Sequence, residues 1–349
     1  MHIFNYSYLR TGLVPAKFLE LTARISEIRA LQSNRQASYA DIFKNLELQA
    51  KVSSIRDSSA IEGIKTTEGR LTAIVTQNAE PRNRDEVEIA GYRDALDLVH
   101  TQHQNLSISE ESIQHLHQLL LSKTGKPGGS YKQEDNIITS EDPQGLISVQ
   151  FMPLSASETP QAMEALILAY KEARDDALIN QLLLISNFVL DFLCIHPYGD
   201  GNGRVSRLLT LLLLYKSGFD AGKYVSLEEK IKQTKNSYYS SLKAASKGWH
   251  DNLNDPLPFT EHFITTLFLC YKELDAYFIS VRDKKVTKTE RIEAAVLGSL
   301  LPISKKELAR LLPDVSVTTI ESVLGRMVVE ERIRKIGKGP STQYLKNLE

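Results

Sequence analysis

The segment from His196 to Arg207, with the sequence HPYGDGNGRVSR, combines residue types that suit chemistry on a phosphate group. Its centre is small and flexible and consists of Gly201, Asn202 and Gly203. Such residues let successive backbone N–H groups point the same way, and a nest of this kind at a helix start binds anions. Arg204 and Arg207 are three residues apart, so on a helix they share a face and can both donate to phosphate oxygens.

Two other side chains of this segment suit proton transfer and metal binding. His196 precedes the nest and has the chemistry of a general base or acid. Asp200 offers a hard oxygen ligand of the type that Mg²⁺ takes together with substrate phosphates. Each residue alone also fits a structural histidine or an ordinary tight turn, and the spacing does not match a P-loop. The combination favours a phosphate-handling site.

The whole segment resembles the signature of the Fic (Fic/Doc) family, His-Pro-Phe-x-Asp/Glu-Gly-Asn-Gly-Arg-x-x-Arg, with Tyr198 in place of Phe. This resemblance implies a protein adenylyltransferase that moves AMP from ATP to a Ser, Thr or Tyr hydroxyl of a target protein. In that role His196 deprotonates the hydroxyl and Asp200 holds Mg²⁺. The backbone amides of residues 201–203 form the anion hole, while Arg204 binds the β-phosphate and Arg207 the γ-phosphate.

Two further regions extend the resemblance to nucleotide binding. The residues from Gly129 to Lys132, followed by a strand-like run, are similar to the flap of the family, which clamps the nucleotide and aligns the target segment by strand addition. The clamping run is Asn136, Ile137, Ile138 and Thr139. The residues that resemble the lining of the adenine pocket are Tyr238, Tyr239 and Ser246; Asn is common in the family where Ser246 stands.

An inhibitory motif is also suggested by the resemblance. Ser58 and Glu62 are one helical turn apart and Gly63 follows directly, which resembles the Ser/Thr-x-x-x-Glu-Gly/Asn motif found before the core in one class of the family. In that class the glutamate pairs with the second signature arginine, here Arg207, and obstructs the γ-phosphate. The resemblance therefore implies a self-inhibited enzyme. In some relatives the same glutamate supports removal of AMP, and this activity stays open.

The composition restricts the class of protein. The chain of 349 residues carries 42 Lys and Arg against 43 Asp and Glu, a formal net charge of −1. This balance argues against a protein that coats nucleic acid or a membrane surface. The two cysteines, Cys194 and Cys270, lie in apolar stretches, which argues against a disulfide framework and favours a reducing compartment. We expect a cytoplasmic protein with no membrane contact.

Helical periodicity predicts a mainly α fold. The pattern indicates a long helix over 15–77, shorter helices over 86–100 and 110–121, and two buried apolar helices over 177–195 and 205–215. Residues 136–139 and 146–151 read as strands joined by turn residues, which predicts a β-hairpin in this helical body.

The last part of the chain has the element order of a winged helix. Ser304 and Glu307 form a capping box, Ser316 begins a second helix, and strands are expected over 333–336 and 342–345. We therefore predict three parts. These are an N-terminal helical region over 1–105 with the inhibitory motif, a helical Fic core with a β-hairpin flap over 106–282, and a winged helix over 283–349.

The sequence leaves two alternative functions open. Residues 283–349 carry a net charge of +4, so the chain could be a DNA-binding regulator with an inert signature loop, or this part could dock a protein. Transfer of another group within the same fold, such as UMP, phosphocholine or phosphate, is a second alternative. The intact Gly203 and Arg204 favour nucleotidyl transfer. Dimers are common among relatives, and the sequence leaves dimerisation undecided.

Overall fold

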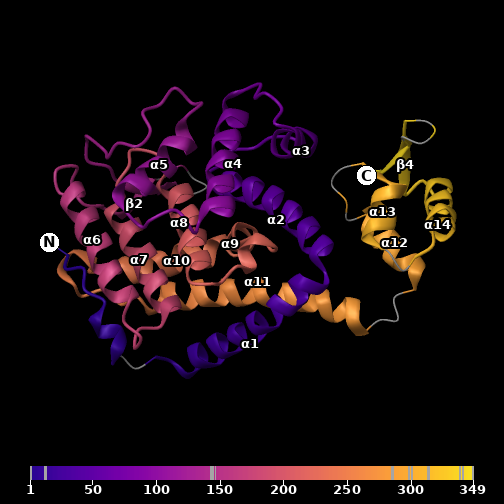
Figure 1. Ribbon diagram of the computed structural model, residues 1–349. Helices are drawn as coiled ribbons and strands as arrows, with labels where there is room; N and C mark the ends of the chain where they lie inside the picture. Colours follow the sequence, from indigo (N-terminus) through magenta and orange to yellow (C-terminus); the bar gives the residue numbers. More distant parts are fainter. Residues whose placement is uncertain are drawn as a thin grey trace.

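The computed structural model describes residues 2–11, 14–141, 145, 147–283, 287–297, 299, 302–312, 315–337, 339 and 342–347. Helices form most of the molecule, and the described strands make one two-stranded and one three-stranded sheet (Figure 1). The mainly α fold with a small hairpin is therefore confirmed. Within the described residues, no helix is both long enough and apolar enough to cross a membrane.

The N-terminal region contains several helices where the sequence pattern predicted one long helix over 15–77. They are α1 (Ala16–Ser38), α2 (Ala40–Ile61) and α3 (Glu68–Gln77), and α4 (Arg84–Gln102) follows them. The first break lies at Tyr39, whose φ of −132° and ψ of 39° leave the helical region. The second lies at Gly63, where a φ of +82° suits glycine and ends α2. Hydrophobic periodicity continues across both breaks, so it could not reveal them.

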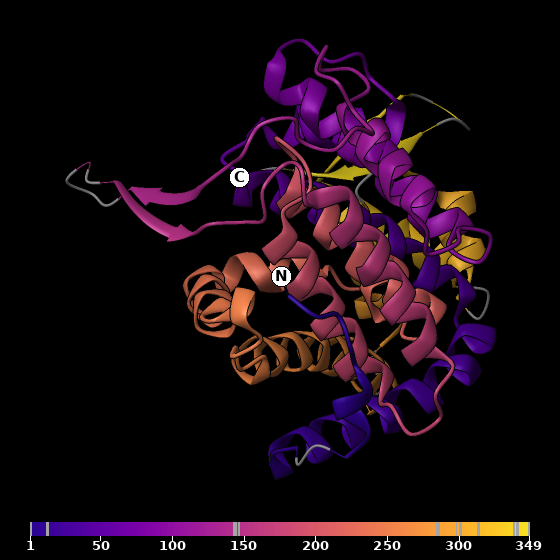
Figure 2. The ribbon, with the colours of Figure 1, turned by 90° about the vertical axis from the view of Figure 1, so that its left-hand side faces the viewer.

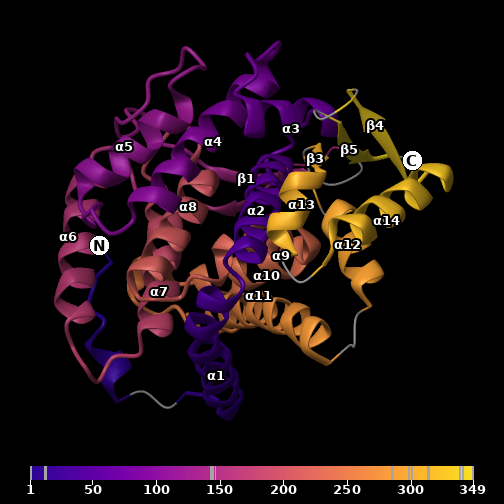
Figure 3. The same ribbon diagram turned by 45° about the vertical axis from the view of Figure 1, so that its right-hand side comes forward.

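The middle of the chain is a packed set of helices around two apolar ones. Its helices are α5 (Glu110–Leu121), α6 (Thr159–Arg174), α7 (Gln181–Ile195), α8 (Asn202–Lys216), α9 (Leu227–Gln233), α10 (Lys235–Ser246) and α11 (Leu257–Asp283). Helices α7 and α8 pack against each other and are buried along nearly their whole length, as their composition predicted. A single apolar cluster extends from Tyr6 to Phe278 and includes Ile55 and Ile61 of α2. Helix α2 lies beside α9 (Figure 3).

The β-hairpin projects from the helical body (Figure 2). It consists of β1 (Ile138–Glu141) and β2 (Ile147–Phe151), paired antiparallel with Thr139 opposite Val149. The predicted strand over 136–139 was therefore wrong in its position, because β1 begins two residues later. Asn136 is outside the strand because its side chain bonds to Lys132 and to the carbonyl of Tyr198. The predicted turn over 140–145 falls largely outside the described residues.

The C-terminal part has its own apolar cluster, from Ile292 to Tyr344. Its elements are α12 (Lys288–Leu297), β3 (Ile303–Ser304), α13 (Lys305–Leu311), α14 (Val317–Val329), β4 (Ile333–Ile336) and β5 (Gln343–Lys346), with strand order β3-β5-β4. Both bonds of the expected capping box between Ser304 and Glu307 are present. The winged-helix interpretation of this part stays a prediction. Arg332 is ion-paired with Glu293, so the charge of this cation in the C-terminal part is already balanced by a carboxylate.

Candidate active site

The signature segment forms the connection between the two buried helices. Helix α7 ends at Ile195, and His196 caps it with a left-handed φ of +52°. Helix α8 begins at Asn202, and Gly201 before it has a φ of +82°. The Asn202 side chain accepts from the backbone N–H of Tyr198 at 2.9 Å and donates to its carbonyl at 2.7 Å. These two bonds hold the loop in a tight conformation, so that the N-terminus of α8 lies close to His196.

His196 is a neutral histidine that is only partly buried. Its Nδ1 atom is buried and faces the backbone of Leu193, so Nε2 is the ring nitrogen that a substrate could reach. Burial and, secondarily, the positive charge of Lys132 lower the pKa of His196 to about 4. Lys132 is itself held close by, because its Nζ donates to the carbonyl of Ile195 at 3.2 Å and to Asn136 at 2.9 Å. A neutral imidazole beside an anion-binding loop can accept a proton from a hydroxyl at neutral pH.

The end of α2 reaches the second signature arginine. Arg207 is buried, and its Nη2 donates to Glu62 Oε1 at 2.8 Å and to the carbonyl of Ser58 at 3.1 Å. Its Nε donates to the Ser58 hydroxyl at 2.8 Å. Burial alone would raise the pKa of Glu62, but the charge and hydrogen bond of Arg207 outweigh it and lower this pKa below its usual value. The structure thus brings Ser58, Glu62 and Arg207 together across 145 residues of sequence.

The Glu62 carboxylate also covers the start of α8. A Cβ atom placed on Gly203 would lie 2.5 Å from Glu62 Oε1 and 3.3 Å from Arg207 Nη1. Only glycine allows this approach, since real Cβ atoms do not come so close to an oxygen. An anionic oxygen therefore occupies the place at the N-terminus of α8 where the sequence predicted a bound phosphate.

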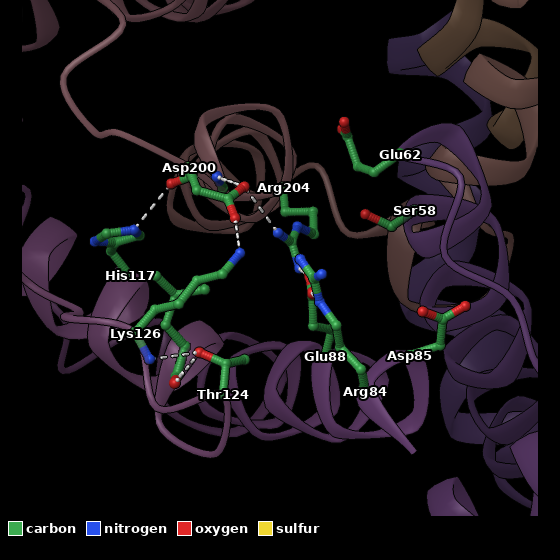
Figure 4. Close-up of polar contacts among 12 residues, drawn as sticks. Ser58, Glu62, Arg84, Asp85, Glu88, His117, Thr124, Lys126, Asp200 and Arg204 are labelled. Atoms are coloured by element: carbon green, nitrogen blue, oxygen red, sulfur yellow. Dashed lines mark hydrogen bonds and ion pairs between the residues drawn. The ribbon is translucent and has the colours of Figure 1, made fainter.

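Arg204, the first signature arginine, lies in a chain of alternating charges (Figure 4). Its Nη1 donates to Glu88 Oε2 at 2.8 Å, and its Nη2 is 3.3 Å from Asp200 Oδ1. The other oxygen of Asp200 pairs with Lys126. Burial raises the pKa of Asp200, but Lys126 and Arg204 outweigh this effect and the net pKa is lowered, so Asp200 is an anion. This series of four side chains, from Glu88 through Arg204 and Asp200 to Lys126, therefore contains two negative and two positive charges.

Asp200 fits a metal ion that is bound jointly with a nucleotide. Its side chain is 43% exposed, and its carboxylate contacts the partly exposed Lys126, the buried Arg204 and the N–H of Gly201 at 2.6 Å. Among the described residues, no cluster of three or more His, Cys, Asp or Glu side chains could enclose a metal. A single carboxylate beside an anion nest is the arrangement in which Mg²⁺ takes its other ligands from phosphates and water.

His117 on α5 fixes the loop from behind. Its ring stacks on Tyr198 with centroids 3.7 Å apart. Its Nδ1 accepts from the N–H of Gly129 at 3.0 Å, so its Nε2 donates to the carbonyl of Asp200 at 3.1 Å. Burial lowers the pKa of His117 to about 4, which keeps the ring neutral and this bonding pattern intact. Tyr198 packs as Phe would, and its buried hydroxyl has no partner.

Comparison with known proteins identifies this region. A sequence model described as Fic/DOC family matches residues 107–214, which include His117, the start of the flap segment and the whole signature loop. The chain carries a Fic/DOC domain. No curated protein matches the chain. Proteins with Fic domains are generally transferases.

Solved structures support the fold of the Fic/DOC domain and its surroundings. A Fic family protein from Desulfovibrio desulfuricans G20 is 20% identical, with a TM-score of 0.63 over 97% of this chain and 98% of that chain. A Fic domain containing signaling protein from Bacteroides thetaiotaomicron VPI-5482 is 22% identical, with a TM-score of 0.56 over 75% and 97%. Fic-1 (aa134–508) from C. elegans is 18% identical, with a TM-score of 0.59 over 76% and 74%.

Other predicted residues lie partly outside the matched Fic/DOC domain. Tyr238 is buried and lines the same cavity as Arg207, whereas Tyr239 is 43% exposed. The Ser246 hydroxyl donates to the carbonyl of Lys243 at 3.3 Å within its own helix. In the flap, the exposed Ile137 precedes β1, and Ile138 and Thr139 begin it.

Sequence reasoning missed Glu88, His117 and Lys126 as parts of the site, and it named Lys132 only as part of the expected flap. Glu88 and His117 each stand among buried apolar neighbours on an amphipathic helix. A charged or titratable residue on such a face signals a partner that the local sequence does not contain. That signal could have marked both positions, although not the identity of their partners.

Proposed function

We propose that this chain is a protein adenylyltransferase that transfers AMP from ATP to a Ser, Thr or Tyr hydroxyl of a target protein, and that Glu62 inhibits it by pairing with Arg207. The observation that carries this proposal is the position of the Glu62 carboxylate. It contacts Arg207 at 2.8 Å and sits against Gly203, where an anionic ligand of the Fic/DOC domain would bind. An internal anion there is well placed to compete with a nucleotide phosphate.

The proposed reaction uses the neutral state of His196. The ring accepts the proton of the target hydroxyl while the hydroxyl oxygen forms a bond to the α-phosphorus of ATP. The bond from the α-phosphorus to the bridging oxygen breaks, and pyrophosphate leaves. The amides at the start of α8 and the guanidinium groups of Arg204 and Arg207 stabilise the phosphate charge. Asp200 would hold Mg²⁺, which would supply further neutralisation of the phosphate charge.

The inhibited state follows from the same contacts. Arg207 has two donor atoms engaged by Ser58 and Glu62, so its guanidinium is not free for the γ-phosphate. Ser58 belongs to α2 and Glu62 caps its C-terminal end. This end is also held by the Nζ of Lys235, which donates to the carbonyl of Ile61 at 2.9 Å. ATP that enters this state must displace the Glu62 carboxylate or bind with its terminal phosphates misplaced.

The target is proposed to be a protein segment that adds to the flap. Ile147 and Val149 on β2 are 65% and 58% exposed, and Ile137 beside β1 is 54% exposed. Exposed apolar side chains on a two-stranded hairpin suit an extended peptide, which pairs through its backbone and packs its side chains against them. We also retain the division into a region over 1–105, a core over 106–282 and a winged helix over 283–349 as part of this proposal.

The direct test is labelling of protein from radioactive ATP. Wild-type, Glu62→Gly and His196→Ala chains are incubated with ATP labelled at the α- or the γ-phosphate. The proposal predicts strong label in Glu62→Gly from the α position, weak label in wild type and none in His196→Ala. Label from the γ position would instead mean phosphate transfer, and equal labelling of wild type and Glu62→Gly would exclude inhibition by Glu62.

A further inference from the structure

Arg204 is unusual because one of its donors has a buried partner and another has none. The side chain is 3% exposed, and its Nη1 donates to Glu88, which is 6% exposed. Its Nε is buried without any hydrogen-bond partner. A buried donor without a partner is costly, and in a native protein it calls for an explanation.

The geometry of a guanidinium group makes this pattern meaningful. Nε and Nη2 lie on one edge and can bind two oxygens of one phosphate, while Nη1 lies at the remaining corner. In Arg204 that corner is taken by Glu88. The Nε–Nη2 edge has only the 3.3 Å contact of Nη2 with Asp200. The edge suited to bidentate phosphate binding is therefore the one that lacks strong partners.

We propose that Glu88 is a positioning residue that holds Arg204 by Nη1 and presents its Nε–Nη2 edge to the β-phosphate of the nucleotide. This inference rests on the proposed function and adds a residue from α4 to the nucleotide site. Glu88 fills the role because its side chain is 6% exposed on α4 and meets Arg204 with the oxygen Oε2. Its other oxygen faces Arg84, which is 77% exposed and 3.4 Å away.

If Glu88 positions Arg204 in this way, its replacement should lower the affinity only for nucleotides that have a β-phosphate. Calorimetric titrations with Mg²⁺ and either ADP or AMP are made in the Glu62→Gly background, with and without Glu88→Ala. We expect Glu88→Ala to weaken ADP binding at least about tenfold, the effect of losing a hydrogen bond to a charged group, and AMP binding less than about twofold. General damage to the fold would weaken the binding of both nucleotides equally.

Two variants separate positioning from other roles. Glu88→Gln keeps an acceptor at the same distance, so we expect ADP affinity within about threefold of the background. Arg84→Ala removes only the solvent-side partner of Glu88, and we expect it to change the affinity for neither ADP nor AMP. If Glu88→Ala does not fold, as judged by circular dichroism, Glu88→Asp replaces it, because its shorter side chain keeps the charge and withdraws the acceptor. The same selective loss of ADP binding is expected.

Each outcome decides the inference. Equal weakening of ADP and AMP, unchanged ADP affinity, or a Glu88→Gln protein as weak as Glu88→Ala overturns the positioning role. A Glu62→Gly protein that binds both nucleotides but labels no protein overturns the proposed function, while the comparison of ADP with AMP still decides the role of Glu88. A Glu62→Gly protein that binds neither nucleotide overturns both.

Discussion

Glu62 and Arg207 form a hydrogen-bonded ion pair at 2.8 Å, with the carboxylate lying over the first turn of the helix that carries the arginine. Glu62 comes from the end of α2, and Arg207 comes from α8. The pair therefore joins the N-terminal region to the signature loop at the place where nucleotide phosphates are proposed to bind.

Replacing Glu62 by Gly is expected to increase AMP transfer at least about tenfold, because the freed guanidinium gains a phosphate partner. The measurement is the initial rate of self-labelling from α-labelled ATP. The double variant Glu62→Gly/His196→Ala serves as the control and should show no label. A rate for Glu62→Gly no higher than wild type contradicts the inhibitory role.

Replacing Ser58 by Ala is expected to activate the protein partially. The Nε of Arg207 loses its hydroxyl acceptor, but the bonds to Glu62 and to the carbonyl of Ser58 persist. The labelling rate should therefore lie between those of wild type and Glu62→Gly. A rate equal to that of Glu62→Gly would show that the hydroxyl, rather than the carboxylate, maintains the inhibited state.

The activity of Glu62→Gly is expected to change little with pH on the acid side down to about pH 5. The pKa of His196 is lowered to about 4, so the neutral, proton-accepting form persists far below the ordinary histidine value. Activity should fall only as pH approaches 4, where the ring becomes protonated. A kcat/KM profile that is half-maximal near pH 6.5, the ordinary value, argues against this buried neutral base.

Replacing Lys126 by Met is expected to strengthen divalent metal binding. The ammonium group pairs with Asp200, the proposed metal ligand, and both side chains are partly exposed. Such pairs are worth little, so we expect about a two- to fivefold gain in Mn²⁺ affinity, measured by electron paramagnetic resonance with ADP present. Lys123→Met is the matched control, because Lys123 pairs with Asp94 instead. Unchanged or weaker Mn²⁺ binding would refute the competition.

Replacing Tyr198 by Phe is expected to stabilise the fold by about 1 kcal/mol, because a buried hydroxyl without a partner is removed. The contrasting variant is Tyr6→Phe. It removes a hydroxyl that donates a hydrogen bond to the buried Asp191 at 2.8 Å in the wild-type protein. That change should destabilise by about 1–3 kcal/mol. Urea unfolding measures both. Loss of stability in Tyr198→Phe would mean that its hydroxyl has a partner in solution.

The features that could be predicted from the sequence are those that depend on residues close together in the chain. The signature loop is continuous, so the spacing of Gly201, Arg204 and Arg207 placed them together at one helix start. The capping box of Ser304 was readable for the same reason, since its partner stands three residues later. The buried character of α7 and α8 followed from their apolar composition.

Contacts between distant segments could not be predicted in this way. Glu88 meets Arg204 across 116 residues, and Lys126 meets Asp200 across 74. The family resemblance alone suggested the pairing of Glu62 with Arg207. Two helix boundaries within residues 15–77 were not predicted. At Tyr39 no Pro or Gly marks the break, and the ring of Tyr39 contacts Phe278 far along the chain. At Gly63 a glycine is present, but the hydrophobic periodicity continues past it.

The burial of α2 restricts how the proposed inhibition could be relieved. Ser58, Ser59 and Ile61 are buried, and Ile55 and Ile61 belong to the same apolar cluster as the catalytic helices. Removal of the N-terminal region would therefore expose apolar side chains of this cluster, and we expect it to destabilise the Fic/DOC domain rather than activate it. We expect relief to come instead from a movement of the Glu62 side chain while α2 stays packed. Point substitution, and not proteolytic trimming, is the practical route to a constitutively active form.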